Sequence, residues 1–390
     1  MLENESKSLR RRDFVPNAKN FHGNLMEIAQ LAHRVYGYDL ESFASYLVWK
    51  YQKNPLGAIL SVCDHDGQIV GAGAMMPVLM KINKNLRQCA IGGDLMVLPE
   101  YRRMGIMTAV SKHNTEEAQR RGFLMIYGTQ PPTSRTNRGL LKSGLRSHVG
   151  DFPVWKKYLS RASAAITLWH YPKLTLRNLA MYLYSLADLV LVSAEEFLLS
   201  LNASLAQAIF RSRKNVQGSI KVNEIKPLVF DDDFENFCQR SQEAFPVAVA
   251  RTKEYLNWRY SNPGYVPDRI RYFGFRADCE SGLCGYIVVA YLDKEKMRTA
   301  YIMDIVSSSP DVTAALVRKI IRHARENKTH VLTTWGSNGF KNEYRRAGLA
   351  RSRFEKQSVH LRVLESQEEN SVLSDISKWY ITVGDIEDWL

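Results

Sequence analysis

The sequence has no hydrophobic run long enough to cross a membrane. Its most apolar stretch, residues 151–225, is interrupted by Asp188, Glu195 and Glu196, and no window of about 20 residues is free of charge. The N-terminal residues are polar and lack the apolar core of a secretion signal. We therefore expect a cytoplasmic protein, and we leave open a peripheral membrane contact through residues 160–210.

Cysteine is scarce. The 390 residues include five cysteines, an odd number at scattered positions: Cys63, Cys89, Cys238, Cys279 and Cys284. No pair of them combines with histidines at metal-binding spacing. We expect reduced thiols, neither a disulfide framework nor a metal site.

The charge is predominantly positive, with 53 basic and 40 acidic residues and a net charge of +13. The basic residues are dispersed, and no helix-turn-helix or RNA-binding signature accompanies them. We expect no DNA partner and do not favour RNA. A basic surface also suits a polyanionic cofactor.

The stretch around position 100 gives the clearest prediction of a strand followed by a turn and a helix. Residues 95–98 form an apolar run that predicts a buried strand, and Pro99 ends it because proline has no N–H to donate. Gly105 permits a tight turn, after which we expect a helix over residues 106–121 and a stop at Gly122.

A strand, a basic turn and a helix start together favour an anion site. The first amides of a helix have no internal partners, and the helix dipole favours negative charge near them. Arg102 and Arg103 add positive charge to the turn. The glycine spacing matches neither the P-loop nor the dinucleotide-binding fingerprint, so a different phosphate-binding bend is predicted.

Residues 94–106 resemble the pyrophosphate loop of the GNAT acyltransferases, in which a strand ending in Val-x-Pro-Glu is followed by Arg/Gln-x-x-Gly-x-Gly/Ala. The departure is Met107, where the family usually has a small residue. The resemblance implies an α/β (α+β) fold with a mixed, mostly antiparallel sheet flanked by helices. It also implies acetyl-CoA or another acyl-CoA as co-substrate, and no metal.

The resemblance implies where the cofactor binds. In this family the sheet opens beside the strand before the loop, and the pantetheine arm pairs with that strand, at Met96 and Val97 here. Asn137 stands where the family often places an asparagine that contacts the cofactor. The residues implied for the pyrophosphate are those of the bend: Arg102, Arg103, Met104, Gly105 and Ile106.

For catalysis the resemblance implies a carboxylate, here Asp94, as the base or as the group that orients a water. Asp304 occupies the same place in the second half of the chain, so a shared structural hydrogen bond is the alternative. The position of the family's tyrosine acid holds Leu140, although the second half has Tyr344 there. Tyr127 is our candidate acid; otherwise the thiolate leaves unaided or through water.

The chain contains an internal repeat. Residues 46–55 and 255–263 share the pattern Tyr-Leu-x-Trp-basic-Tyr followed by Asn-Pro, and residues 303–306 mirror 93–96. The second copy has no Arg-Arg-x-Gly turn, so we expect it not to bind CoA. The chain resembles tandem GNAT proteins with one degenerate copy.

The repeat predicts two domains joined by a helical segment. The expected boundaries are a polar lead-in at 1–20, a GNAT domain with the acyl-CoA loop at 21–150, an apolar helical linker at 151–225, a degenerate domain at 226–363 and a docking tail at 364–390.

The leading hypothesis is an acyl-CoA-dependent N-acyltransferase acting on a primary amine of a small molecule, sugar or amino acid. One alternative is a FemAB-like aminoacyl-tRNA-dependent transferase, which the positive charge suits and the intact CoA loop opposes. Another is a non-catalytic acyl-CoA sensor or scaffold, which Leu140 and the degenerate second copy favour. The sequence leaves the acceptor, the acyl chain length and the oligomeric state open.

Overall fold

The computed structural model describes residues 14–132, 146–159, 220–261, 270–294, 297–336, 338–365 and 369–386, with single residues at 134, 139, 141, 144 and 263. Most of the expected lead-in and linker, together with Asn137 and Leu140, lies outside the described residues. The chain forms two compact units: unit 1 (Met1–Phe152, Phe230–Ile270 and Glu355–Leu390) and unit 2 (Pro153–Val229 and Arg271–Phe354).

Unit 1 is built on a mixed sheet. β1 to β4 pair antiparallel, as do β5 and β13, whereas β4 and β5 run parallel. β8 (Val247–Val249) pairs with β3 and with β14 (Trp379–Tyr380). The main strands, in spatial order, are β1 (Ala18–Asn20), β2 (Ile59–His65), β3 (Gln68–Ile82), β4 (Asn85–Val97), β5 (Met125–Gln130), the second part of β13 (Ala350–Val363) and the first part of β6 (Ser147–Tyr158).

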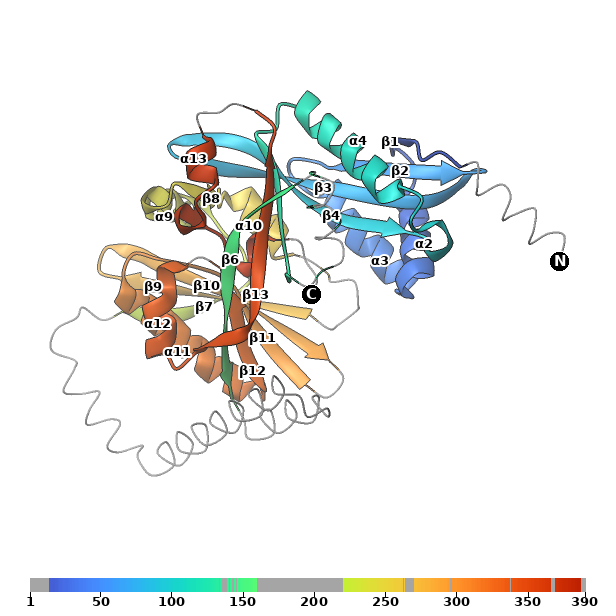
Figure 1. Cartoon of the computed structure of the whole chain (residues 1–390). Helices are drawn as coiled ribbons and strands as arrows, with labels where there is room; N and C mark the ends of the chain where they lie inside the picture. Colours follow the sequence, from blue (N-terminus) through green and yellow to red (C-terminus); the bar gives the residue numbers. More distant parts are fainter. Residues whose placement is uncertain are drawn as a thin grey trace. The chain divides into compact units, whose positions relative to one another are not determined.

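Helices cover both faces of this sheet. α4 (Ile106–Arg120) lies on one face, and α2 (Leu25–Tyr36) and α3 (Leu40–Leu47) lie on the other (Figure 1). α4 approaches the strands closely because Gly71 has no side chain: a Cβ there would lie 2.3 Å from Ile106 Cγ2. The helix predicted after the bend is confirmed, and Gly122 follows it with φ of +72°.

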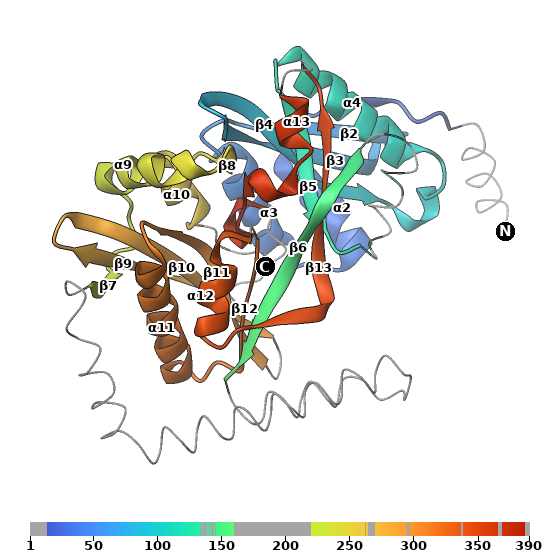
Figure 2. The same ribbon diagram turned by 60° about the vertical axis from the view of Figure 1, so that its left-hand side comes forward.

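The sheet of unit 2 repeats the strand directions seen in unit 1. Its core joins the sheet to α11 (Pro310–Glu326) and α12 (Lys341–Arg346), and β11 and β12 run parallel as β4 and β5 do (Figure 2). The mixed, mostly antiparallel α/β fold is therefore confirmed. The strands in spatial order are the second part of β6, β12 (Val331–Trp335), β11 (Met297–Ser307), β10 (Gly282–Lys294), β9 (Ile270–Cys279) and β7 (Lys221–Ile225).

The compact units do not follow the linear boundaries of the two copies. β6 begins in unit 1 and ends in unit 2, and β13 does the reverse. Phe230–Ile270, which carries α9 (Asp232–Ser241) and α10 (Lys253–Arg259) of the second copy, belongs to unit 1. Unit 1 is thus completed by segments from the far end of the chain.

The two repeated tryptophans meet inside unit 1. Trp49 Nε1 donates to the carbonyl of Trp258 at 2.8 Å, and Trp258 Nε1 donates to the carbonyl of Trp49 at 2.9 Å. Their rings stack with centroids 5.2 Å apart, and both side chains are buried. This reciprocal contact makes both residues part of the core.

All five cysteines are free thiols. Burial raises the pKa of Cys63 to about 11 and that of Cys89 to about 12, so both stay protonated. Among the described residues, no helix combines the length and hydropathy needed to span a bilayer. The same residues contain no cluster of three or more potential metal ligands.

Candidate functional site

The bend after β4 is anchored at its base. The Leu98 amide donates to the Val70 carbonyl at 3.0 Å, and a 3₁₀ turn, η2 (Pro99–Tyr101), follows. Tyr101 is buried, and its hydroxyl lies 2.8 Å from His65 Nδ1. The position at which the bend begins is therefore fixed by these contacts.

The bend itself is open to solvent. Arg102, Arg103 and Gly105 are exposed, and Met104 is half-buried. Arg103 has φ of +67° and Gly105 has φ of +83°. Left-handed backbone is uncommon for a residue other than glycine, and such strain is concentrated at ligand sites and switch regions.

α4 starts without a side-chain cap. Its N-cap residue is Gly105, no side chain bonds to the first amides, and no acidic residue lies in the first turn. Ile106 is buried against Gly71, which fixes the helix start. Uncapped amides with the positive end of the helix dipole can bind a phosphate.

β4 and β5 separate beside this bend. Their ladder consists of Ala90 with Ile126 and Ile91 with Tyr127. β4 continues to Val97 and pairs with β3 through Met96 and Val97. In the described strands no ladder pair joins β5 to Met96 or Val97, so this edge of β4 suits an extended ligand arm.

Asp94 lies at an irregularity of β4. The register with β3 shifts between Ala72 and Ala74, and Asp94 has φ of +46°. Its Oδ2 accepts from Lys50 Nζ at 3.0 Å and from the Tyr51 hydroxyl. Lys50 is buried, so the two charges compensate each other within the fold.

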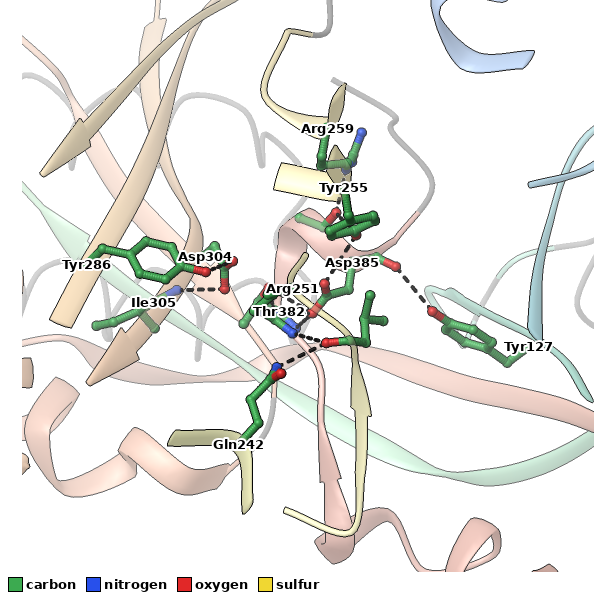
Figure 3. A network of polar contacts seen from close by, with 12 residues as sticks. Tyr127, Gln242, Arg251, Tyr255, Arg259, Tyr286, Asp304, Ile305, Thr382 and Asp385 are labelled. Atoms are coloured by element: carbon green, nitrogen blue, oxygen red, sulfur yellow. Dashed lines mark hydrogen bonds and ion pairs between the residues drawn. The ribbon is translucent and has the colours of Figure 1, made fainter. Parts of the chain in front are cut away.

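Asp304 also accepts a tyrosine hydroxyl, from Tyr286 at 2.8 Å (Figure 3). Its other oxygen accepts from the Ile305 amide at 2.9 Å. This shared bond favours the structural alternative for both aspartates. A role of Asp94 as base stays a prediction.

Tyr127 lies at the end of the β4–β5 ladder and is fully buried. Its hydroxyl is 3.4 Å from the carbonyl oxygen of Asp385, and burial raises its pKa well above the ordinary value. Asp385 also pairs with Arg251 at 2.5 Å and accepts from Tyr255 at 3.3 Å (Figure 3). Tyr127 keeps its proton in this network, and its role as acid stays a prediction.

Sequence reasoning missed a group of residues where β4 and β5 part. Gly92 and Gly128 follow the last ladder pair, and a Cβ on Gly92 would lie 1.9 Å from Nη2 of Arg146. His360 lies opposite Gly128 on β13, and its ring centroid is 5.4 Å from that of His148. The only signal in the sequence was glycine at two strand positions.

Residues 22–135 match the family model of the acetyltransferase (GNAT) domain. The chain contains a GNAT domain. Enzymes with this domain transfer an acyl group from acyl-CoA to an amine. The domain therefore indicates an acyl-CoA-dependent N-acyltransferase. Curated protein sequences give no match.

Solved structures share the fold beyond the GNAT domain. A GCN5-related N-acetyltransferase from Anabaena variabilis has a TM-score of 0.59 at 12% identity, over 90% of this chain and 73% of that chain. A probable N-acyltransferase from Enterococcus faecalis has 0.59 at 11% identity, with the same coverage. Saccharomyces cerevisiae N-myristoyltransferase with bound myristoyl-CoA has 0.54 at 11%, over 91% and 84%.

Proposed function

We propose that the protein transfers the acyl group of acetyl-CoA or another acyl-CoA to a primary amine of a small molecule, sugar or amino acid. The observation that carries this proposal is the exposed bend, which leads into the uncapped start of α4 beside the edge that β5 leaves. The three features together support an acyl-CoA, because its diphosphate is anionic and its pantetheine arm can pair with a free strand edge.

The diphosphate binds at the bend. The amides near Gly105 and Ile106 donate to it, and Arg102 and Arg103 supply positive charge. Met104 lies between them. Each charge-assisted hydrogen bond of this kind contributes about 1.5–3 kcal/mol. Asn137, outside the described residues, is a further proposed contact.

The pantetheine arm extends along β4 and pairs with the main chain of Met96 and Val97. The acceptor amine attacks the thioester carbonyl, and the arrangement of the two reactants supplies much of the acceleration. Asp94 accepts the amine proton or orients a water that does so, and Tyr127 is the candidate acid.

Calorimetry with acetyl-CoA tests this proposal. Arg103→Glu is expected to lower the affinity at least about tenfold because it removes one phosphate contact and repels the diphosphate. Arg322→Glu makes the same charge change at an exposed position of α11, and its affinity should equal that of the wild type. Wild-type affinity for acetyl-CoA in Arg103→Glu as well as in Arg322→Glu would falsify the assignment of the bend.

Product formation separates the remaining alternatives. Thiol release in the presence of an amine library identifies an enzyme, and a comparison of acetyl-CoA with longer acyl-CoAs defines the acyl chain. Binding of aminoacyl-tRNA without binding of acetyl-CoA would favour the FemAB-like alternative. Binding of acetyl-CoA without turnover on any amine would favour the sensor.

A further inference from the structure

A guanidinium group lies where β4 and β5 separate. The last ladder pair is Ile91 with Tyr127, and the next positions are Gly92 and Gly128. A Cβ at Gly92 would lie 1.9 Å from Arg146 Nη2, and a Cβ at Gly128 would lie 2.8 Å from Arg146 Nη1. The two glycines therefore make the space that the guanidinium fills.

Arg146 carries a positive charge at this point, and its neighbour His360 does not. His360 pairs with Gly128 across β5 and β13, so it lies on the same face of the sheet. Burial, with the charges of His148 and Arg146, lowers the pKa of His360 to about 4. His360 is therefore neutral near pH 7, whereas a guanidinium keeps its charge at any such pH.

His148 is held next to this group by Asp151. Its Nε2 lies 3.1 Å from Asp151 Oδ1, which also accepts from Ser358 at 2.6 Å. Lys356 donates to the other oxygen of Asp151. The carboxylate of Asp151 is thus hydrogen-bonded by neighbouring residues of β6 and β13.

The thioester reaches the same point if the proposed function is correct, and the inference rests on it. With the diphosphate at the bend, the pantetheine arm runs back along β4 from Val97 towards Gly92. That part of the strand spans about 16 Å, since each residue advances about 3.3 Å. The reacting end of the arm then lies beside the guanidinium of Arg146.

We propose that Arg146 is a catalytic residue that stabilises the CoA thiolate as it leaves. The amine nitrogen bonds to the thioester carbon, the C–S bond breaks, and its electron pair stays on sulfur. The amine proton passes to a water or to Asp94. Arg146 donates hydrogen bonds and keeps its own proton, so the thiolate leaves as an anion and later takes a proton from water.

This role answers a gap in the sequence. Leu140 stands where the family has a tyrosine that protonates the thiolate, and Tyr127 is buried against Asp385. In this proposal Arg146 takes the place of Tyr127 at the leaving group. A fixed positive charge lowers the free energy of the thiolate itself, so the thiolate needs no proton as it leaves.

The experiment compares the binding of CoA with that of desulfo-CoA, which has no sulfur, from pH 7 to 10 by calorimetry. In the wild type, CoA should gain about 10- to 100-fold over desulfo-CoA as the thiol ionises. Arg146→Gln should lose that preference while its affinity for desulfo-CoA is unchanged, which also shows that it folds. Arg146→Lys should retain part of the preference and of kcat.

A second variant leaves the arginine in place. Gly128→Ala places a methyl group against Nη1 and displaces the guanidinium, so it should also lose the preference for CoA. Equal binding of CoA and desulfo-CoA by the wild type at every pH, or an unchanged preference in both variants, overturns the role of Arg146 and leaves the proposed function standing. If the wild type binds neither compound, the proposed function fails and the inference fails with it.

Discussion

α4 of the first copy and α11 of the second copy follow equivalent strands, yet their first amides have different partners. α4 begins at Gly105, which offers no side chain. α11 begins at Ser309, whose hydroxyl accepts from the Val312 amide at 3.4 Å, and Pro310 has no N–H at all. The same strand-turn-helix plan leaves the first amides without a side-chain cap in one copy, whereas in the other a serine caps one amide and a proline removes another.

The basic residue after the repeated tryptophan also has different partners in the two copies. Lys50 pairs with Asp94 of its own copy. Arg259 donates instead to the carbonyls of Gly384 and Ile386, the latter at 2.8 Å. The second copy's residue thus holds the C-terminal segment inside unit 1, whereas Lys50 compensates a carboxylate beside the proposed ligand site.

The largest expected effect comes from breaking that support. Asp385→Ala leaves the charge of Arg251 buried without its partner, and we expect a loss of about 3–5 kcal/mol in the free energy of unfolding. Urea denaturation measures it. Asp375→Ala, at an exposed N-cap, is the control and should cost much less. A similar small loss in both variants would contradict a supporting role of the C-terminal segment.

The pH dependence of stability tests whether β13 of the second copy completes the sheet of unit 1. The pKa of His360 falls from 6.5 in the unfolded chain to about 4 in the fold. The unfolded chain therefore binds more protons between these values, and stability should fall by at most about 3 kcal/mol as the pH drops from 6.5 to 4. Above pH 6.5 the residue has no effect.

His360→Gln should remove this part of the pH dependence in urea titrations. Asp151 provides the internal control: burial raises its pKa, but hydrogen bonds from Lys356, Ser358 and His148 together lower it to about 2, so its contribution is lost only below pH 3.8. An unchanged slope between pH 6.5 and 4 in the variant would show that His360 is not buried beside Arg146.

Sequence reasoning found what local chemistry determines. The apolar run before Pro99, the glycine of the bend and the amphipathic helix after it are each encoded within a few residues, and the repeat follows from shared spacing. Arg146 was missed because it meets Gly92 and Gly128 only through the arrangement of β4 and β5. The exchange of β6 and β13 was missed because two similar copies allow the same pairing within or between them.

A side chain that caps the first amides of α4 should make the start of this helix resemble that of α11 and weaken the binding of acetyl-CoA. Gly105→Asp puts a carboxylate at the start of α4, and the left-handed backbone there adds strain. We expect the affinity for acetyl-CoA to fall about 10- to 100-fold, as measured by calorimetry. Ser309→Asp is the matched change in α11 and should leave acetyl-CoA binding intact.

The smallest effect is expected from removing the cap of the second copy. Ser309→Ala takes away the oxygen that accepts from Val312, which costs about 1 kcal/mol in the free energy of unfolding. Acetyl-CoA affinity should not change, because residues 307–311 carry no arginine and Pro310 offers no amide. If this variant instead gained or lost acetyl-CoA affinity, the second copy would hold part of the cofactor site, and the division of roles between the copies would be wrong.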